Sequence, residues 1–281
     1  MPKHSAIPLL ILQGIVLAGL CGAGACFAGT SHNDRWADRE AVIYTPTRMP
    51  AFGSREMVVV LHGGLGNAQR IAEQRSESGL NFNALAEAGG FVVAYLNGTP
   101  VARGLSQQRL GWNAGTCCGV PASTQRDDVA YVQSAVKEIA AHYGVDIQRV
   151  FGVGHSNGAM MTQRLMCETG LYVAAVAVSG GLENGAEKCP SARGKNIMGL
   201  HGEQDHNVPV EGGRGRGLSR VDFRSESDTA RVWKESGANY LLQVIPRAEH
   251  AVESLDTEIR AQEGISLAQK VVRFFGLPVG P

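Results

Sequence analysis

Six segments along the chain have the pattern of sheet strands. They comprise residues 57–62, 91–96, 148–154, 172–178, 196–202 and 239–245. The first four are short apolar runs without the alternation of a half-exposed strand, which is typical of strands buried on both faces of a sheet. A weaker apolar group at residues 41–44 predicts an edge strand. The polar residues 29–40 before it predict irregular structure.

Helical patterns alternate with these strands. They cover residues 81–88, a stretch from 127 or 128 to 143, residues 159–168, 225–235 and a final helix at about 264–275. Asp127 or Asp128 is expected to cap the second helix, and Ser225 with Asp228 has the spacing of a capping box. A helix between two buried strands makes the strands parallel. The predicted fold class is therefore α/β, with a mostly parallel central sheet and helices on both faces.

Composition narrows the functional classes. The 281 residues suit one large α/β domain, and 26 basic residues balance 26 acidic ones. This balance predicts no attraction to nucleic acid or to a membrane surface. The glycine-rich motifs of dinucleotide and nucleotide binding are absent from the sequence, so hydride and phosphoryl transfer have no support.

The N-terminus has the pattern of a targeting segment. Lys3 and His4 precede an apolar run at residues 7–20, which is short for a membrane span but fits a signal-peptide core. Cleavage after Ala25 or Ala28 predicts a signal peptide at residues 1–28 and a single catalytic domain at 29–281. The expected location is secreted or periplasmic, without a stable membrane span. A lipoprotein with lipid on Cys21 or Cys26 is the alternative.

Four cysteines follow the predicted signal peptide: Cys117, Cys118, Cys167 and Cys189. In an exported protein they favour disulfides, but the sequence leaves their connectivity open. They lack the spacing of a zinc site, so neither a metal nor a cofactor is expected.

The motif Gly154-His155-Ser156-Asn157-Gly158 joins a predicted strand to a predicted helix. This G-x-S-x-G pattern indicates a sharp turn that holds the central serine in a strained conformation and exposes its hydroxyl. Ser156 is therefore the candidate nucleophile.

Two other regions are expected to shape the site. His62-Gly63-Gly64 follows a central strand, and its backbone N–H groups are candidate donors to an oxyanion. Residues 97–126 form a long, glycine-containing stretch that predicts a wall of the substrate pocket, as long connections are usually functional or disordered. Within it, Trp112 is expected either to contact substrate or to hold the wall by packing.

A general base and an acid are expected after the serine in the order acid, then histidine. Asp205 and Glu203 both follow the strand at 196–202, where loops converge on the active crevice of a doubly wound sheet. Asp205 is preferred over Glu203 because of a family resemblance as much as because of its position. Of the two later histidines, His206 adjoins Asp205, whereas His250 follows another strand. His250 is therefore the candidate base.

Several blocks together resemble a known family. They are Leu61-His62-Gly63-Gly64, the segment 111–119, Arg126-Asp127-Asp128-Val129, the segment 154–161 and the segment 201–209. In this order they are similar to secreted polyhydroxybutyrate depolymerase and feruloyl esterase-like α/β-hydrolases. The resemblance implies Ser156, Asp205 and His250 as catalytic residues and backbone N–H groups of Gly64 and Asn157 as the oxyanion hole.

The chain departs from these relatives at two places. Many relatives have a cysteine where this chain has Gly64, and their catalytic histidine usually lies in Gly-His-x-Trp-Pro-Gly. Here the corresponding segment is Glu249-His250-Ala251-Val252-Glu253. The change is expected to reshape the rim of the pocket, where His155 and Trp112 are the expected substrate contacts.

The function expected from these features is that of a secreted serine esterase acting through an acyl-enzyme. No additional domain for binding an insoluble polymer is expected. The expected substrates are therefore hydroxyalkanoate oligomers or related soluble esters, and the protein is expected to be a monomer. The alternatives are a feruloyl or acetyl esterase on plant polysaccharide esters, an acyltransferase, and an exported binding protein with an inactive hydrolase fold.

Overall fold

The computed structural model describes residues 29–74, 79–104, 108–217, 219 and 221–279. The predicted signal peptide at 1–28 lies outside these ranges.

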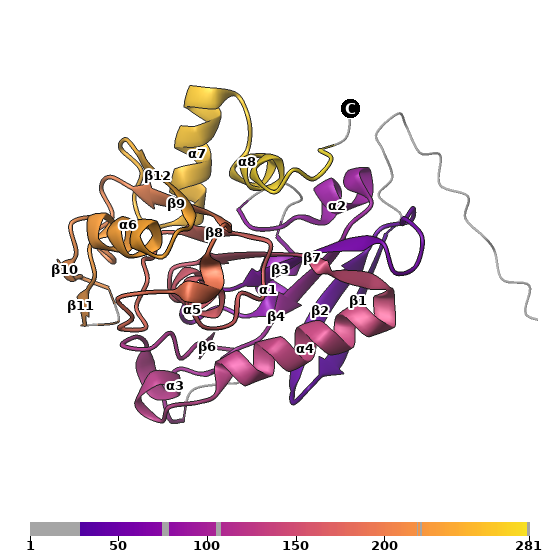
Figure 1. Cartoon of the computed structure of the whole chain (residues 1–281), viewed down its shortest axis with the longest axis horizontal. Helices are drawn as coiled ribbons and strands as arrows, with labels where there is room; N and C mark the ends of the chain where they lie inside the picture. The colour runs from indigo at the N-terminus through magenta and orange to yellow at the C-terminus, as the bar shows by residue number, and fades with distance from the viewer. Residues whose placement is uncertain (1–28, 75–78, 105–107, 218, 220, 280–281) are drawn as a thin grey trace, which may run out of the picture.

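An eight-stranded sheet forms the centre of the molecule (Figure 1). Its order is β1 (Thr30–Trp36), β2 (Arg39–Thr45), β4 (Val92–Leu96), β3 (Arg55–Leu61), β7 (Val145–His155), β8 (Ala174–Val178), β9 (Asn196–Gly202) and β12 (Asn239–Ile245). The six strands from β4 to β12 are mutually parallel, and β1 and β2 join them in antiparallel pairing. The predicted mostly parallel sheet is confirmed.

The N-terminal edge of the sheet differs from the prediction. Residues 29–40 were expected to be irregular, yet Thr30–Trp36 forms β1, and β1 rather than the segment at 41–44 is the edge strand. Six of the seven β1 side chains are not buried, and only Trp36 enters the core. This strand is therefore held by backbone pairing with β2. Such pairing leaves no signal in the pattern of hydrophobic residues.

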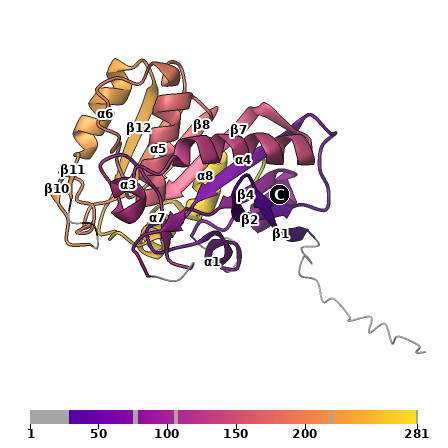
Figure 2. The ribbon, with the colours of Figure 1, turned by 90° about the horizontal axis from the view of Figure 1, so that it is seen from below.

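Helices cover both faces of the sheet (Figures 1 and 2). On one face α4 (Asp128–Tyr143), α5 (Asn157–Thr169) and α6 (Glu226–Glu235) share a core cluster with alternate residues of β3, such as Met57 and Val59. On the other face α2 (Asn83–Gly89), α7 (Val252–Glu263) and α8 (Leu267–Phe274) pack with Val58 and Val60. Successive strand residues point to opposite faces, so each central strand supplies both layers.

Most helix ends follow the expected signals. Asp127 caps α4 through its side chain, Gly144 and Gly170 end α4 and α5, and the Ser225 side chain accepts from the Asp228 N–H at the start of α6. Three of the described helices have no counterpart among the predictions: the short α1 (Ala68–Ala72) and α3 (Gly119–Ser123), and α7, which fills the segment between His250 and the final helix.

The long segment 97–126 contains short elements. They are β5 (Thr99–Pro100), β6 (Leu110–Gly111) and α3 (Gly119–Ser123), with β5 and β6 paired in a small antiparallel sheet. Elsewhere α1 (Ala68–Ala72), η1 (Pro190–Ala192), β10 (Gly213–Arg214) and β11 (Asp222–Phe223) complete the described elements.

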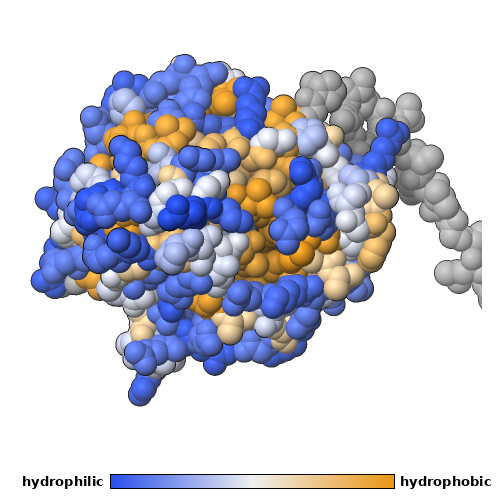
Figure 3. Space-filling view, viewed as in Figure 1, coloured by the Kyte–Doolittle hydropathy of each residue, from blue (hydrophilic) through white to orange (hydrophobic). Residues whose placement is uncertain are grey.

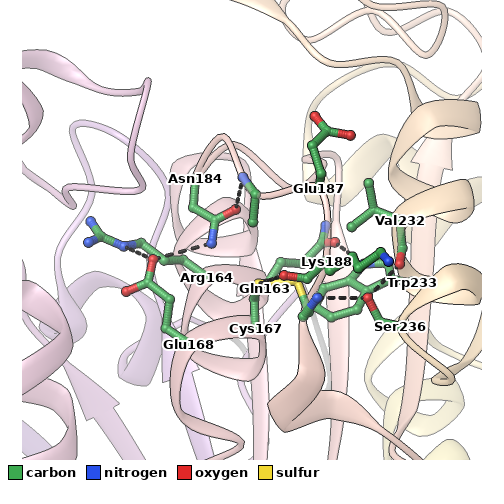
Figure 4. Close-up of a disulfide and its surroundings, with 12 residues drawn as sticks. Gln163, Arg164, Cys167, Glu168, Asn184, Glu187, Lys188, Val232, Trp233 and Ser236 are labelled. Carbon is green, nitrogen blue, oxygen red and sulfur yellow. Dashed lines mark hydrogen bonds and ion pairs between the residues drawn. A yellow bond between two sulfur atoms is a disulfide. The ribbon is translucent and has the colours of Figure 1, made fainter.

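Two disulfides join the four cysteines, Cys117 to Cys118 and Cys167 to Cys189. The second one ties α5 to the segment before η1 (Figure 4). Close by, the Cys189 N–H donates to Ser236 Oγ at 2.7 Å and Trp233 Nε1 donates to Gln163 Oε1 at 2.7 Å. The disulfide thus belongs to a buried contact between α5 and the end of α6.

Hydrophilic residues cover much of the face seen in Figure 3, around an apolar area near its centre. Within the described residues, no helix combines the length and apolar character that crossing a membrane requires.

Candidate active site

Ser156 lies at the turn between β7 and α5, with φ of 54° and ψ of −123°. A positive φ is uncommon for a residue with a Cβ and is held here by its surroundings. Both flanking glycines are required by close approach, since a Cβ at Gly154 would overlap the Gly158 carbonyl and a Cβ at Gly158 would overlap the Leu61 carbonyl. The turn therefore places the Ser156 hydroxyl at the carboxyl end of the sheet.

His250 follows β12 and reaches the serine. Its Nε2 lies 2.9 Å from Ser156 Oγ, and its side chain is 17% exposed. This is hydrogen-bonding distance for the transfer of a proton from the hydroxyl to the imidazole.

Asp205 follows β9 and lies on the other side of the His250 ring, with Oδ2 at 2.7 Å from His250 Nδ1. Its Oδ1 accepts from the N–H groups of Asn207 and Val208 at 2.8 and 2.9 Å. Burial opposes ionisation, but hydrogen bonds from His201 and His250 lower the pKa of Asp205 well below its usual range. The carboxylate is therefore ionised and fixes the His250 tautomer that carries its proton on Nδ1.

The alternative acid, Glu203, and the alternative base, His206, are not part of this arrangement. Glu203 is exposed and its Oε2 accepts from the Arg247 N–H at 3.1 Å. His206 is also exposed, and its contact with the site is made by its carbonyl, which accepts from the Arg216 N–H. The structure brings together Ser156, Asp205 and His250, but not the alternatives.

Gly64 and Asn157 face each other beside the serine. A Cβ built on Gly64 would lie 3.9 Å from the Asn157 Cβ, and both residues line the same cavity. The next N–H in the loop, that of Leu65, donates to the Leu110 carbonyl instead. Asn157 is the first residue of α5, so its N–H has no partner within the helix and is oriented for an anion.

His155 lines the cavity, and its Nε2 lies 2.8 Å from the His250 carbonyl oxygen. Burial and the neighbouring His250 lower the pKa of His155 to about 4. Because a carbonyl only accepts, the neutral ring must carry its proton on Nε2. His155 thus holds the backbone of His250, a contact beyond its expected role toward substrate.

Trp112 does not line the cavity. It is fully buried, its Nε1 donates to the His62 carbonyl at 3.0 Å, and its ring stacks on Tyr131. The Asn157 side chain accepts from the Trp112 N–H and donates to its carbonyl. The structure therefore gives Trp112 the packing role, and substrate contact by this residue is not supported.

The cavity around Ser156 has a volume of about 830 Å³. Its wall includes Val101, Cys118 and Gly119 from the 97–126 segment, Met160 from α5, and Arg216 and Phe223 from the 203–224 segment. Among the described residues no group of three His, Cys, Asp or Glu side chains is arranged to hold a metal ion.

Sequence reasoning missed two buried residues: His201, which contacts Asp205, and Glu226, which contacts His201. His201 Nε2 lies 3.2 Å from Asp205 Oδ2 and its Nδ1 lies 2.8 Å from Glu226 Oε1. The sequence does indicate His201, because it lies near the end of a predicted strand and four residues before Asp205. Nothing in the sequence indicates Glu226, because its position beside His201 depends on the packing of α6 against β12.

No protein-family model matches the chain. Curated relatives match part of it. Feruloyl esterase B of Piromyces equi is 28% identical over 180 residues, which are 62% of this chain and 31% of the relative. NocK of Nocardia uniformis subsp. tsuyamanensis, described as an esterase, is 32% identical over 162 residues, 56% of this chain and 42% of the relative. The match thus spans less than half of each of these relatives.

Solved structures share the fold over most of the chain. An acetyl xylan esterase from Aspergillus awamori covers 89% of it with a TM-score of 0.57 and 15% identity, and 99% of that esterase is covered. The poly(3-hydroxybutyrate) depolymerase LpqC from Bordetella parapertussis covers 84% with a TM-score of 0.53 and 18% identity, and 87% of LpqC is covered. The chain therefore has the α/β-hydrolase fold and is similar in sequence to feruloyl esterases, as its motifs indicate.

Proposed function

We propose that this protein is a serine esterase that hydrolyses carboxylic esters through an acyl-enzyme. The observation that carries the proposal is the chain of contacts from Ser156 Oγ to His250 Nε2 at 2.9 Å and from His250 Nδ1 to Asp205 Oδ2 at 2.7 Å. Similarity to feruloyl esterases and other esterases supports ester hydrolysis.

In the first step Ser156 Oγ attacks the ester carbonyl while His250 Nε2 takes its proton. Asp205 stabilises the resulting imidazolium, and the N–H groups of Gly64 and Asn157 donate to the oxyanion. One such donor contributes about 3 kcal/mol to the barrier reduction in comparable enzymes. The imidazolium then returns the proton to the leaving alcohol, and the acyl group remains on Ser156.

In the second step water replaces the alcohol. His250 takes a proton from the water as it attacks the acyl-enzyme, and then returns a proton to Ser156 Oγ as the acid leaves. His250 lies at the edge of the cavity with partial exposure, so water has access to its Nε2.

Hydroxyalkanoate oligomers or related soluble esters are the proposed substrates. The cavity is open and of ligand size, and its wall combines apolar residues such as Val101 and Phe223 with the basic residue Arg216. No carboxylate among the described residues pairs with Arg216, whose side chain is exposed. A free oligomer of a hydroxy acid carries both an ester and a terminal carboxylate, which match these features.

Feruloyl or acetyl ester hydrolysis is the second candidate, favoured by the sequence similarity to feruloyl esterases. Assays of the purified chain on 3-hydroxybutyrate oligomers, feruloyl esters and acetylated sugars separate the two. An acyltransferase would give a transfer product when an alcohol or sugar acceptor is added.

The decisive experiment replaces the serine. Ser156→Ala is expected to abolish hydrolysis of short p-nitrophenyl esters and labelling by a fluorophosphonate probe. Ser179→Ala is the matched control, because Ser179 also follows a strand with positive φ and its buried Oγ has no hydrogen-bond partner among the described residues. Hydrolysis retained by Ser156→Ala contradicts the proposal, and an unlabelled native protein indicates an inactive binding protein.

We also propose that residues 1–28 are removed during export and that 29–281 acts as a monomer. The two disulfides support an oxidising compartment. N-terminal sequencing of the exported protein and light scattering of the purified chain test these two points.

A further inference from the structure

His201 is a second imidazole in contact with the Asp205 carboxylate. It lies on β9 with 1% of its surface exposed, and its Nε2 is 2.7 Å from the Val208 carbonyl oxygen and 3.2 Å from Asp205 Oδ2. The same carboxylate oxygen accepts from His250 Nδ1 at 2.7 Å. Asp205 Oδ2 therefore faces two histidines, and only His250 reaches Ser156.

The far side of the His201 ring meets a second buried carboxylate. Nδ1 lies 2.8 Å from Glu226 Oε1, and Glu226 is 2% exposed at the first position of α6. Tyr240 on β12 donates its hydroxyl to the other oxygen, Oε2, at 3.0 Å. Both oxygens of Glu226 thus have donors, and a buried row runs from Ser156 through His250, Asp205 and His201 to Glu226.

The hydrogen-bond partners of His201 favour its charged form. The Val208 carbonyl only accepts, so Nε2 carries a proton, and Nδ1 faces a carboxylate. Burial lowers the pKa of His201, but hydrogen bonds to Asp205 and Glu226 outweigh it and raise the pKa to about 10. The titratable groups around this ring are Asp205 in the loop after β9, Glu226 on α6, Tyr240 on β12, His155 on β7 and His250 after β12.

A positive charge on His201 changes the electrostatic environment of His250. An ionised Asp205 alone would attract a proton to His250 with its full charge, because buried charges interact strongly. A cation that shares Oδ2 offsets part of this attraction. It also fixes the carboxylate from the side opposite to its backbone donors, since Oδ1 is occupied by the N–H groups of Asn207 and Val208.

We propose that His201 is a positioning residue, a buried imidazolium held by Glu226, which orients Asp205 toward His250 and offsets part of the carboxylate's charge. This inference rests on the proposed function for its effect on catalysis, but the charge of His201 can be measured without any turnover.

The first test is nuclear magnetic resonance of the full chain labelled with ¹⁵N-histidine, titrated from pH 5 to 9. Both ring nitrogens of His201 are expected to keep the shifts of an imidazolium throughout. In Glu226→Gln, which removes one of the two carboxylates, His201 should lose its proton within this range. Tyr240→Phe removes the hydroxyl but keeps the carboxylate, so His201 should remain protonated. A His201 ring that titrates near pH 6.5 in the native chain overturns the proposal.

The second test measures the effect on His250. In His201→Gln the acidic limb of the kcat/KM profile is expected to move to higher pH by roughly one unit. The double variant His201→Gln with Glu226→Gln avoids an unpaired buried carboxylate and should show the same direction of shift. A purely structural role would lower activity at all pH values and leave the limb in place, which would overturn the proposal.

The His250 ring signals give the same readout if the protein hydrolyses no ester. They are expected to move in His201→Gln relative to the native chain, because Asp205 loses one of its two imidazole partners. Activity retained by Ser156→Ala would therefore contradict the esterase proposal without deciding the charge of His201. Conversely, a neutral His201 would leave the esterase proposal intact.

Discussion

His155 Nε2 lies 2.8 Å from the His250 carbonyl oxygen, so the residue before the candidate nucleophile holds the backbone of the candidate base. The two rings are also adjacent, with centroids 5.0 Å apart. The turn that strains Ser156 and the loop that presents His250 are thereby joined by a bond that involves neither reacting atom. Their relative position is set before any substrate binds.

Removing this bond should slow catalysis. His155→Ala leaves the His250 carbonyl without its donor and loosens the loop, so kcat is expected to fall roughly tenfold. His155→Gln keeps an amide donor and should recover most of the loss. Steady-state kinetics on a p-nitrophenyl ester measures both variants, and an alanine variant with native kcat would contradict the positioning role.

The positive charge of Arg216 should lower the KM for esters that carry a free carboxylate. Arg216→Gln is expected to raise KM about fivefold for a 3-hydroxybutyrate trimer with a free carboxylate, which corresponds to a loss of about 1 kcal/mol typical of an exposed ion pair. KM for the methyl ester of the same trimer should not change. Arg214→Gln is the control, since Arg214 is exposed and is not part of the cavity wall. Equal effects on both trimers would exclude carboxylate recognition.

His62 should make the folded state sensitive to acid. Its Nδ1 donates to the Gly63 carbonyl and its Nε2 accepts from the Gly98 N–H, and burial lowers its pKa to about 4. The unfolded chain binds a proton at this residue below about pH 6.5. The unfolded state therefore binds more protons between pH 6.5 and 4, and stability falls as the pH falls through this window, by about 3 kcal/mol from this residue.

Denaturant unfolding at several pH values measures this effect. His62→Gln is expected to be less stable at pH 7 and to lose less stability on acidification than the native chain. If the two chains showed the same pH dependence, His62 would not be the titrating group. Asp205 contributes in the same direction at lower pH, because its depressed pKa keeps the folded carboxylate ionised while the unfolded chain binds a proton at this residue.

The disulfide between Cys167 and Cys189 should stabilise the fold without contributing to the chemistry. It closes a loop with a sequence separation of 22 residues, and such a loop contributes about 3 kcal/mol through the unfolded state. Replacing both cysteines by alanine is expected to lower the free energy of unfolding by about this amount, with kcat unchanged under native conditions. A large loss of kcat in the folded variant would instead connect this disulfide to the site.

The buried strands could be predicted because a strand covered on both faces leaves a continuous apolar run, as Met57 to Leu61 does. The first strand could not, since its polar side chains are exposed and only its backbone pairs. The helix at Val252–Glu263 had a signal that was missed, because Val252, Leu255 and Ile259 recur at helical spacing and are all buried.

At the site, the turn around Ser156 was predictable from the sequence, because Gly154 and Gly158 indicate that the strand and the helix approach each other closely. The choice of Asp205 and His250 followed from the order of the elements and, for Asp205, from the family resemblance as much as from position; the structure places both within hydrogen-bonding reach of each other. The neighbouring Glu226 depends on tertiary packing between segments 25 residues apart, which no local pattern encodes.

Ser156, Asp205 and His250 each directly follow a strand or its turn, whereas the cavity wall comes largely from the excursions at 97–126 and 203–224. The residues expected to select the substrate thus lie largely in two segments outside the central sheet. Exchanging only the cavity-lining parts of these excursions between homologues, with Asp205, its backbone donors and the buried Trp112 kept, is a route to new ester specificities that leaves Ser156, Asp205 and His250 in place.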